Sequence, residues 1–368
     1  MDTFLRWFEV SLGLGGLILL FLIFVALIAL IAKLKRRSVG GEGEIRLKVT
    51  PLNDYYDDLR DTLLENILED KAWKEIEKKR KKEDSEKLKA EKVKEKENKK
   101  NAVEADTLSE LPKVFVIDFD GDIQASAVNK LRDMVTALVA VALPQDEIVL
   151  RLESGGGMVH SYGLAAAQLN RLKDASLKLT ICIDKIAASG GYMMACVAHR
   201  VVAAPFAIVG SIGVVASMPN LNRLLRKNDV DYLELTAGDY KRTLTLFGEV
   251  TEKGKAKFQE QLQETHELFK NHIAHHRPQL DIENVGTGEY WYGIKAKELN
   301  LIDEISTSDT YIVAAASKSK VFKIEAFVKE TLRQKLSQAV MAFAEKGIES
   351  IVSGLTKRNS DIHQNVMH

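Results

Sequence analysis

Short apolar segments that end in glycine turns alternate with segments of helical spacing from Lys113 onward. β-Branched and aromatic residues make each apolar segment a predicted strand, and residues spaced by three or four predict the helices between them. Strands and helices that alternate in this way form repeated βαβ units around a mostly parallel sheet. We therefore predict an α/β fold whose ligands bind at the carboxyl ends of the strands, where the glycine turns lie. The predicted strands cover residues 113–121, 147–154, 177–184 and 199–205, and helices are predicted at 126–142 and 251–276.

Two of these turns are candidates for a binding or catalytic site. Gly155 to Gly157 follow a strand and precede a helix, where backbone N–H groups can approach an oxyanion or a phosphate. No nucleotide-binding signature accompanies them, and an unliganded turn is the alternative. Ser189 lies in AASGGY, whose small residues leave room for a substrate, and the Gly190 amide directly after it is a usual place for an oxyanion donor. The alternative for Ser189 is that it caps the following helix.

A lysine follows another turn further along the chain. Lys241 stands in AGDYKRT, 52 residues (241 − 189) after Ser189. A desolvated lysine that has lost its proton can replace histidine as the base for a serine nucleophile. Ser211, between two glycines in VGSIGV, has a hydroxyl that could orient the amine of that lysine. The alternatives are a solvent-exposed lysine and a serine in an ordinary turn.

The aspartates at the end of the first strand form a competing motif. Asp118, Asp120 and Asp122 in VFVIDFDGD resemble the DxDG signature of phosphatases that form an aspartyl phosphate. Asp122 stands where that signature has threonine, and no later acidic pair is evident for Mg²⁺. Because short motifs match by chance, phosphatase chemistry is the weaker interpretation.

Histidines suggest two further alternatives. Four of them crowd one end of the helix predicted at 251–276, but no HExxH motif occurs, so zinc protease chemistry is not indicated. His160 could serve Ser189 in a histidine-based dyad, although no acidic residue stands beside it. We predict neither a metal nor a cofactor. The four histidines are His266, His272, His275 and His276.

Composition excludes some classes of function. The formal net charge is zero although 28% of the residues are charged, which argues against nucleic-acid binding by the chain as a whole. Cys182 and Cys196 both lie in apolar segments, so they are predicted to be buried thiols rather than a disulfide framework.

An apolar segment near the amino terminus predicts a membrane anchor. Val10 to Ala32 carry no charge and, at about 1.5 Å per residue, would span about 34 Å as a helix. Lys and Arg residues are more frequent after this segment than before it, which favours a cytoplasmic location for the rest of the chain. The predicted regions are an amino-terminal segment (1–9), the anchor (10–32), a charged tether (33–112), a catalytic domain (113–325) and a helical extension (326–368).

Five motifs in order resemble those of the signal peptide peptidase A family. They are ESGGGMV, AASGGYMMA, GSIGVV, DYKRT and YGIKAKELNLIDEI, and the resemblance extends over roughly Lys113 to Ile305, about half of the chain. The resemblance implies a fold related to ClpP and crotonase, and a Ser-Lys dyad with Ser189 as nucleophile and Lys241 as general base. It also implies that the amides of Gly156 and Gly190 form the oxyanion hole and that Ser211 orients the lysine. Members of the family degrade signal peptides and other short or unfolded chains, and the half-length members form rings whose subunits complete one another's sites.

The chain departs from the family pattern at three positions. Gly155 and Leu246 stand where prolines are common, and Asn300 replaces a glycine. None of these changes removes the dyad. The family precedent places the catalytic domain outside the cytoplasm, against the charge rule. A membrane scaffold without catalytic activity on the same fold is the alternative function.

Overall fold

The computed structural model describes residues 45–82, 85–86 and 112–328. Within this part of the chain, residues 47–326 form one compact unit. None of the helices described here is long and apolar enough to cross a membrane. The predicted segment 1–9 and anchor 10–32 lie outside the described residues, as do much of the tether 33–112 and almost all of the extension 326–368.

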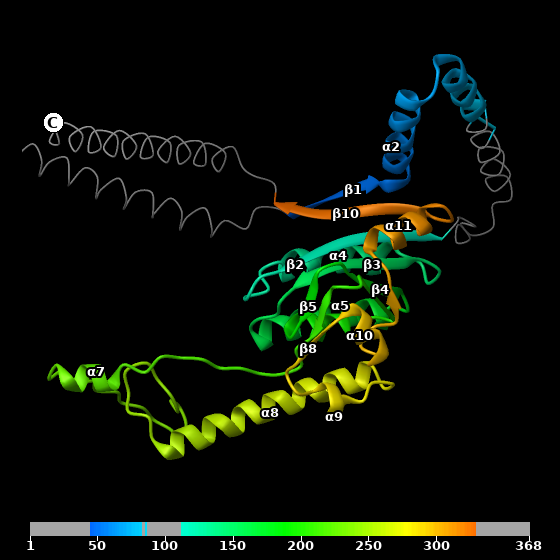
Figure 1. Ribbon diagram of the computed structural model, residues 1–368. Coiled ribbons are helices and arrows are strands. Elements are labelled where there is room, and N and C mark those ends of the chain that lie inside the picture. The colour runs from blue at the N-terminus through cyan, green and yellow to red at the C-terminus, as the bar shows by residue number, and fades with distance from the viewer. Residues whose placement is uncertain (1–44, 83–84, 87–111, 329–368) are drawn as a thin grey trace, which may run out of the picture. The chain divides into compact units, whose positions relative to one another are not determined.

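Ten strands form one sheet (Figure 1). They are β1 (Ile45–Pro51), β2 (Lys113–Gly121), β3 (Glu147–Ser154), β4 (Lys178–Ile183), β5 (Ile186–Ala188), β6 (Arg200–Ala203), β7 (Ile208–Gly210), β8 (Tyr290–Tyr292), β9 (Glu304–Ile305) and β10 (Lys320–Val328). The main order is β1-β10-β2-β3-β4-β6-β9, and β5, β7 and β8 extend the sheet from β3. The central pairs are parallel, whereas β8 runs antiparallel to β7. The prediction of an α/β fold with a mostly parallel sheet is confirmed.

Helices connect most of the parallel strands. They are α2 (Leu52–Ile67), α4 (Val128–Val141), α5 (Val159–Asp174), α6 (Gly190–Ala195), α7 (Asn222–Lys227), α8 (Glu252–His276), α9 (Ile282–Val285), α10 (Gly293–Glu298) and α11 (Ser308–Ala316), and residues 70–82 form a further helix. Both helices predicted from apolar spacing, 126–142 and 251–276, are present as α4 and α8. Helix α2 begins at Leu52, directly after β1. Its first turn is fixed by Asn53, whose side-chain nitrogen donates to the carbonyl of Ala316, 2.9 Å away.

The sheet has an apolar core on each of its faces. Phe115 and Ile117 of β2 belong to the larger core, which also contains residues of α4, α5 and α6. Val114 and Val116 face the other way and pack with Ile312 of α11. Successive side chains of a strand point to opposite faces of the sheet, which explains this alternation. Burial of each of these apolar side chains contributes about 1.5–3 kcal/mol to the free energy of unfolding.

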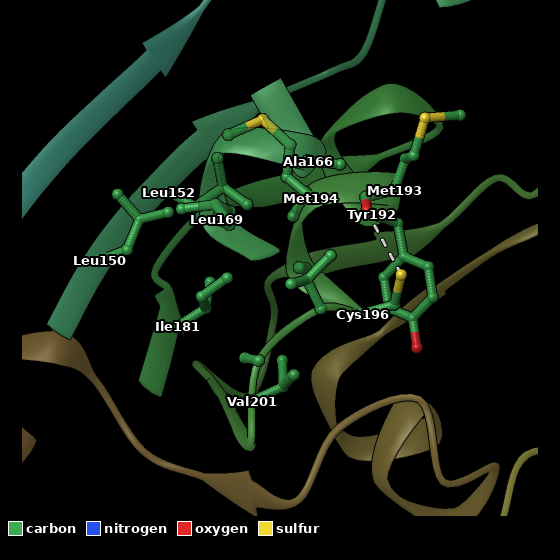
Figure 2. Packing of buried hydrophobic residues seen from close by; sticks show 14 of the residues in the cluster. Leu150, Leu152, Ala166, Leu169, Ile181, Tyr192, Met193, Met194, Cys196 and Val201 are labelled. Carbon is green, nitrogen blue, oxygen red and sulfur yellow. Dashed lines mark hydrogen bonds between the residues drawn. The ribbon is translucent and has the colours of Figure 1, made fainter. Parts of the chain in front are cut away.

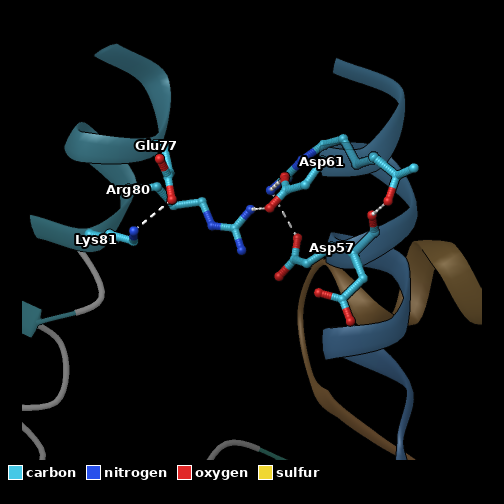
Figure 3. A network of polar contacts seen from close by, with 8 residues as sticks. Asp57, Asp61, Glu77, Arg80 and Lys81 are labelled. Atoms are coloured by element: carbon cyan, nitrogen blue, oxygen red, sulfur yellow. Dashed lines mark hydrogen bonds and ion pairs between the residues drawn. The ribbon is translucent and has the colours of Figure 1, made fainter. Parts of the chain in front are cut away.

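Residues 70–82 of the predicted tether form a helix that faces α2 (Figure 3). A guanidinium nitrogen of Arg80 contacts the carboxylate of Asp61, and Lys81 pairs with Glu77 on its own helix. An ion pair as exposed as that of Lys81 and Glu77 contributes about 0–1 kcal/mol to the free energy of unfolding. Leu64 and Trp73 line a small cavity between the helices together with these charged groups.

Helix α6 lies deep in the larger core (Figure 2). The hydroxyl of Tyr192 donates to the carbonyl of Leu301 at 2.8 Å, so this buried phenol has a partner. Both cysteines are free and buried, as predicted, and burial raises the pKa of the Cys182 and Cys196 thiols to about 12. Neither thiol is therefore suited to act as a nucleophile.

A buried arginine joins the end of α8 to the turn before β9. Arg277 makes two hydrogen bonds to the carboxylate of Asp303, at 2.7 and 2.9 Å, and a third to the carbonyl of Asn300 at 2.8 Å. Asn300 has a φ of 61°, in the left-handed region that asparagine tolerates better than most residues. This explains why an asparagine can replace the family's glycine here.

Candidate active site

Three neighbouring strands bring the predicted site residues other than Lys241 to one edge of the sheet. In the parallel register Ser154 of β3 pairs with Ala187 of β5, and Ala188 pairs with Gly210 of β7. The residues that follow these strands therefore lie side by side, as expected for the carboxyl ends of a parallel sheet. They line a cavity of about 640 Å³. Its polar side chains are Ser189, Ser211, His266 and Thr287, its apolar ones are Val159, Met193, Val214, Val215 and Phe269, and glycines of the turns complete the lining.

Ser189 stands in a strained turn between β5 and α6. Its φ of 52° and ψ of −118° are rare for a residue with a side chain, and such a conformation costs about 1–3 kcal/mol. A hydrogen bond from its backbone amide to the carbonyl of Gly210, at 2.8 Å, helps to hold the turn. Although Ser189 precedes the helix, its side chain makes no capping hydrogen bond. The capping alternative is therefore excluded, and the hydroxyl remains available at the cavity.

The glycine turn after β3 and the turn that carries Ser189 touch backbone to backbone. Gly156 has a φ of 88°, and a Cβ placed on it would lie 2.7 Å from the amide nitrogen of Gly190 and 2.8 Å from the carbonyl oxygen of Ala188. A Cβ on Gly190 would lie 2.4 Å from the ring of Tyr162. Both positions therefore require glycine on steric grounds alone.

The amides of these glycines have different partners. The Gly156 amide, implied as an oxyanion donor, instead donates to the Oγ of Ser154 at 3.1 Å. Among the described residues, no hydrogen bond is formed by the amides of Gly157 and Gly190, and both residues line the cavity. Gly156 also lines the cavity, so its role as an oxyanion donor stays a prediction, and the unpartnered amide of Gly157 is a second candidate.

The segment after β7 forms another wall of the cavity. Ser211, with a φ of 52°, donates its backbone N–H to the carbonyl of Glu289 at 2.7 Å. His266 on α8 donates from Nε2 to the carbonyl of Ile212 at 3.1 Å, because a carbonyl can only accept. His266 was not predicted as a site residue. Its spacing of three from the buried Phe269 was the signal that this histidine faces the core.

The other histidines of α8 have structural roles or face solvent. His272 is hydrogen-bonded through Nε2 to the carbonyl of Met193 at 3.0 Å, and desolvation lowers its pKa. Desolvation, with nearby positive groups, lowers the pKa of His276 to about 4. The described residues contain no cluster of three or more side chains suited to hold a metal ion. Exposed His160 does not line the cavity.

The described chain does not bring Lys241 to Ser189. Lys241 is exposed and does not line the cavity. The ring of the adjacent Tyr240 lies 5.2 Å from Nζ of Lys253 and 5.5 Å from Nζ of Lys257, at the start of α8. At 1.5 Å per residue, those lysines stand about 14–20 Å along the helix from His266 at the cavity. The segment that carries α7 and Lys241 extends away from the sheet (Figure 1).

Comparisons with known proteins identify the family. The model for the N-terminal region of peptidase family S49 matches residues 8–169, and that for peptidase family S49 itself matches residues 171–322. The probable protease SohB of Haemophilus influenzae is 51% identical over 248 residues, which are 67% of this chain and 69% of that protein. This chain belongs to peptidase family S49.

Further relatives within and beyond bacteria agree with this assignment. The probable protease SohB of Buchnera aphidicola subsp. Acyrthosiphon pisum is 50% identical over 62% of this chain and 68% of that protein. The chloroplastic serine protease SPPA of Arabidopsis thaliana is 26% identical over 56% of this chain and 30% of that protein. The resemblance stated from the motifs is confirmed, and peptidase chemistry is supported for the chain. The dyad of Ser189 and Lys241 remains a prediction.

The aspartates of the phosphatase alternative lie outside the cavity. Burial favours a higher pKa for Asp118, but hydrogen bonds and charge from Arg151, with Lys323, lower it overall. The carboxylate of Asp122 accepts a hydrogen bond from the hydroxyl of Ser126 at 2.7 Å and holds a turn. Membership of the S49 family and these structural roles leave the phosphatase alternative without support.

The contact between the two turns predicts that a methyl group at Gly156 lowers peptidase activity, whereas one at Gly163 does not. Gly156→Ala should lower peptide hydrolysis about 100-fold or more, because the new methyl group must push the two turns apart. Gly163→Ala, in α5, is the matched control. Its Cβ meets nothing within 4 Å, so activity should persist and stability should rise by up to about 1 kcal/mol. Hydrolysis assays and thermal denaturation of both variants test this, and wild-type activity in Gly156→Ala would contradict it.

Proposed function

We propose that this chain is a membrane-anchored serine endopeptidase in which Ser189 is the nucleophile and Lys241 of another copy is the general base. One observation carries the proposal. Ser189 is held in a strained turn, with an uncapped hydroxyl, at a cavity where the amides of Gly157 and Gly190 have no partner among the described residues. Nucleophile and oxyanion donors at one cavity are the parts that acyl transfer needs.

The chemistry follows from this arrangement. The Oγ of Ser189 attacks the carbonyl carbon of the scissile peptide bond and gives its proton to the neutral amine of Lys241. The carbonyl oxygen becomes an oxyanion that accepts hydrogen bonds from the amides of Gly157 and Gly190. The protonated lysine then gives its proton to the leaving nitrogen as the C–N bond breaks. Water, deprotonated by the same lysine, hydrolyses the resulting ester and restores Ser189. Ser211, at the cavity wall, is proposed to orient the lysine amine.

A lysine from a second copy fits the surface of the segment that carries it. Val215, Leu233 and Leu235 in this segment are 88%, 80% and 85% exposed, values that are unusual for large aliphatic side chains. Exposed apolar surface of this kind marks an interaction site. A ring in which each copy extends this segment to its neighbour would cover these residues and complete the cavity with Lys241.

His266 offers a second candidate base. It is the one titratable side chain among the described residues that line the cavity. Its Nε2 is already bonded to the carbonyl of Ile212, so only Nδ1 can accept a proton. A Ser189–His266 pair would act within one chain and would not use Lys241. Peptide cleavage should then persist when Lys241 is substituted.

The proposed substrates are signal peptides or other short or unfolded polypeptides. The apolar side chains of the cavity, among them Val159, Met193 and Phe269, suit an apolar residue of such a chain. The sheet that carries the site is also compatible with the relation to ClpP and crotonase that the motifs imply. A scaffold without catalytic activity is the alternative function, and peptide cleavage by the purified wild-type protein no greater than that by Ser189→Ala would favour it.

Complementation between inactive variants tests the proposal. Ser189→Ala and Lys241→Ala should each lose most activity, because members of a dyad act as a unit. Coexpressed in equal amounts and purified as mixed oligomers, they should recover about one quarter of the wild-type activity per site, since one site in four receives both an intact serine and a neighbour's intact lysine.

A second mixture provides the control. Wild type mixed with the Ser189→Ala/Lys241→Ala double variant should also give about one quarter if the dyad forms between copies, but about one half if it forms within one chain. Activity that persists in Lys241→Ala would point to His266 instead. No recovery in demonstrably mixed oligomers would contradict a shared site.

We also propose that residues 10–32 anchor the protein in the bacterial inner membrane, with the peptidase domain on the cytoplasmic side. The excess of Lys and Arg after the apolar segment supports this side. The full chain should stay in the membrane pellet after an alkaline carbonate wash. Protease added outside spheroplasts should leave residues 113–328 intact. Their digestion, while a cytoplasmic marker is still protected, would place the domain on the opposite face.

A further inference from the structure

Two buried hydroxyl groups lie between the glycine turn and the nucleophile turn. Ser154 ends β3 and Tyr162 belongs to the first turns of α5, and both side chains are buried. Their oxygens are 2.5 Å apart. Neither residue lines the cavity, so neither can touch a substrate directly.

The hydrogen bonds of this pair join the glycine turn to the residues at the end of β2. The Tyr162 hydroxyl donates to the carbonyl of Asp122 at 2.7 Å, because a carbonyl can only accept. The Ser154 hydroxyl can donate either to the Tyr162 oxygen, 2.5 Å away, or to the carbonyl of Gly121, 3.1 Å away. The Oγ of Ser154 accepts the amide of Gly156 at 3.1 Å. A series of hydrogen bonds therefore connects the backbone of the glycine turn, through Ser154 and Tyr162, to the end of β2.

The same two residues also support the other turn. A Cβ on Gly190 would lie 2.4 Å from the Tyr162 ring, so this ring lies directly against the residue after the nucleophile. A Cβ on Gly191 would lie 2.5 Å from the carbonyl oxygen of Ser154. Ser154 and Tyr162 thus contact both the glycine turn and the nucleophile turn.

We propose that Ser154 and Tyr162 are positioning residues, which fix the glycine turn against the nucleophile turn so that the amides of Gly157 and Gly190 meet at one substrate oxygen. This rests on the proposed peptidase function. By holding the Gly156 amide, Ser154 directs the next amide of the turn to the cavity. A displacement of one donor by about 1 Å is enough to slow a reaction about 100-fold.

Kinetics of two variants in the full chain test this inference. Ser154→Ala should lower kcat about 10- to 100-fold and change KM less than about twofold, because the displaced amide serves the transition state more than the bound substrate. Tyr162→Phe should have a smaller effect, about three- to tenfold, since the Ser154 hydroxyl can turn to the carbonyl of Gly121, 3.1 Å away. The double variant should be no slower than Ser154→Ala within about twofold, because both act through one chain.

Two variants that remove a buried serine hydroxyl and a buried tyrosine hydroxyl at other places in the fold are the matched controls. Ser308→Ala deletes a buried hydroxyl bonded to Asp184, and Tyr192→Phe deletes the one bonded to Leu301. Both should lower thermal stability but leave kcat within about twofold of wild type. If they reduce kcat as much as Ser154→Ala and Tyr162→Phe do, stability alone accounts for the loss and the inference is overturned.

Hydrogen exchange gives a readout that does not depend on activity. In Ser154→Ala the amides of residues 155–158 should exchange about fivefold faster or more, because the Gly156 amide has lost its acceptor. Ser308→Ala should leave them unchanged. Equal exchange in wild type and Ser154→Ala would show that Ser154 does not hold the turn, whatever the kinetics. Full activity of Ser189→Ala would instead overturn the proposed function, and exchange would still decide this inference.

Discussion

The close contact between two pieces of backbone organises this site. The Cα of Gly156 lies against the amide of Gly190 and the carbonyl of Ala188, with no space for a side chain. Both segments emerge from parallel strands of one sheet, so the contact is set by the register of β3, β5 and β7. Because backbone atoms have few degrees of freedom, this contact fixes the two turns relative to each other.

The surrounding structure maintains this contact from several directions. Ser154 and Tyr162 lie beneath it, and helix α8 contacts both neighbouring segments through His266 at Ile212 and His272 at Met193. Arg277, paired with Asp303, attaches the end of the same helix to the turn before β9. The strain at Ser189 persists because these contacts fix the backbone on both sides of it.

The sequence was sufficient to predict much of the fold, and Ser189, Gly190 and Ser211 of the predicted site line one cavity. Period-two strands, the spacing in α4 and α8, and small residues around Ser189 are local signals, and the structure confirms the elements they predicted. The orientation of individual amides depends on contacts between distant segments, so the sequence did not distinguish Gly156 from Gly157. His266 was missed for the same reason, since its role comes from a carbonyl 54 residues away. Lys241 does not line the cavity in the described chain, and no signal in the sequence indicated this, because the path of its segment depends on packing and not on a local pattern.

The most direct test of this account is an experimental structure of the assembled full chain with a peptide phosphonate bound covalently to Ser189. The account predicts that the phosphoryl oxygen accepts hydrogen bonds from the amides of Gly157 and Gly190, while the Gly156 amide stays bonded to Ser154. It also predicts that Nζ of Lys241 from a neighbouring copy lies within hydrogen-bond distance of the Ser189 oxygen. A phosphoryl oxygen bound by other groups, or a Lys241 that remains in solvent in the assembled protein, would contradict it.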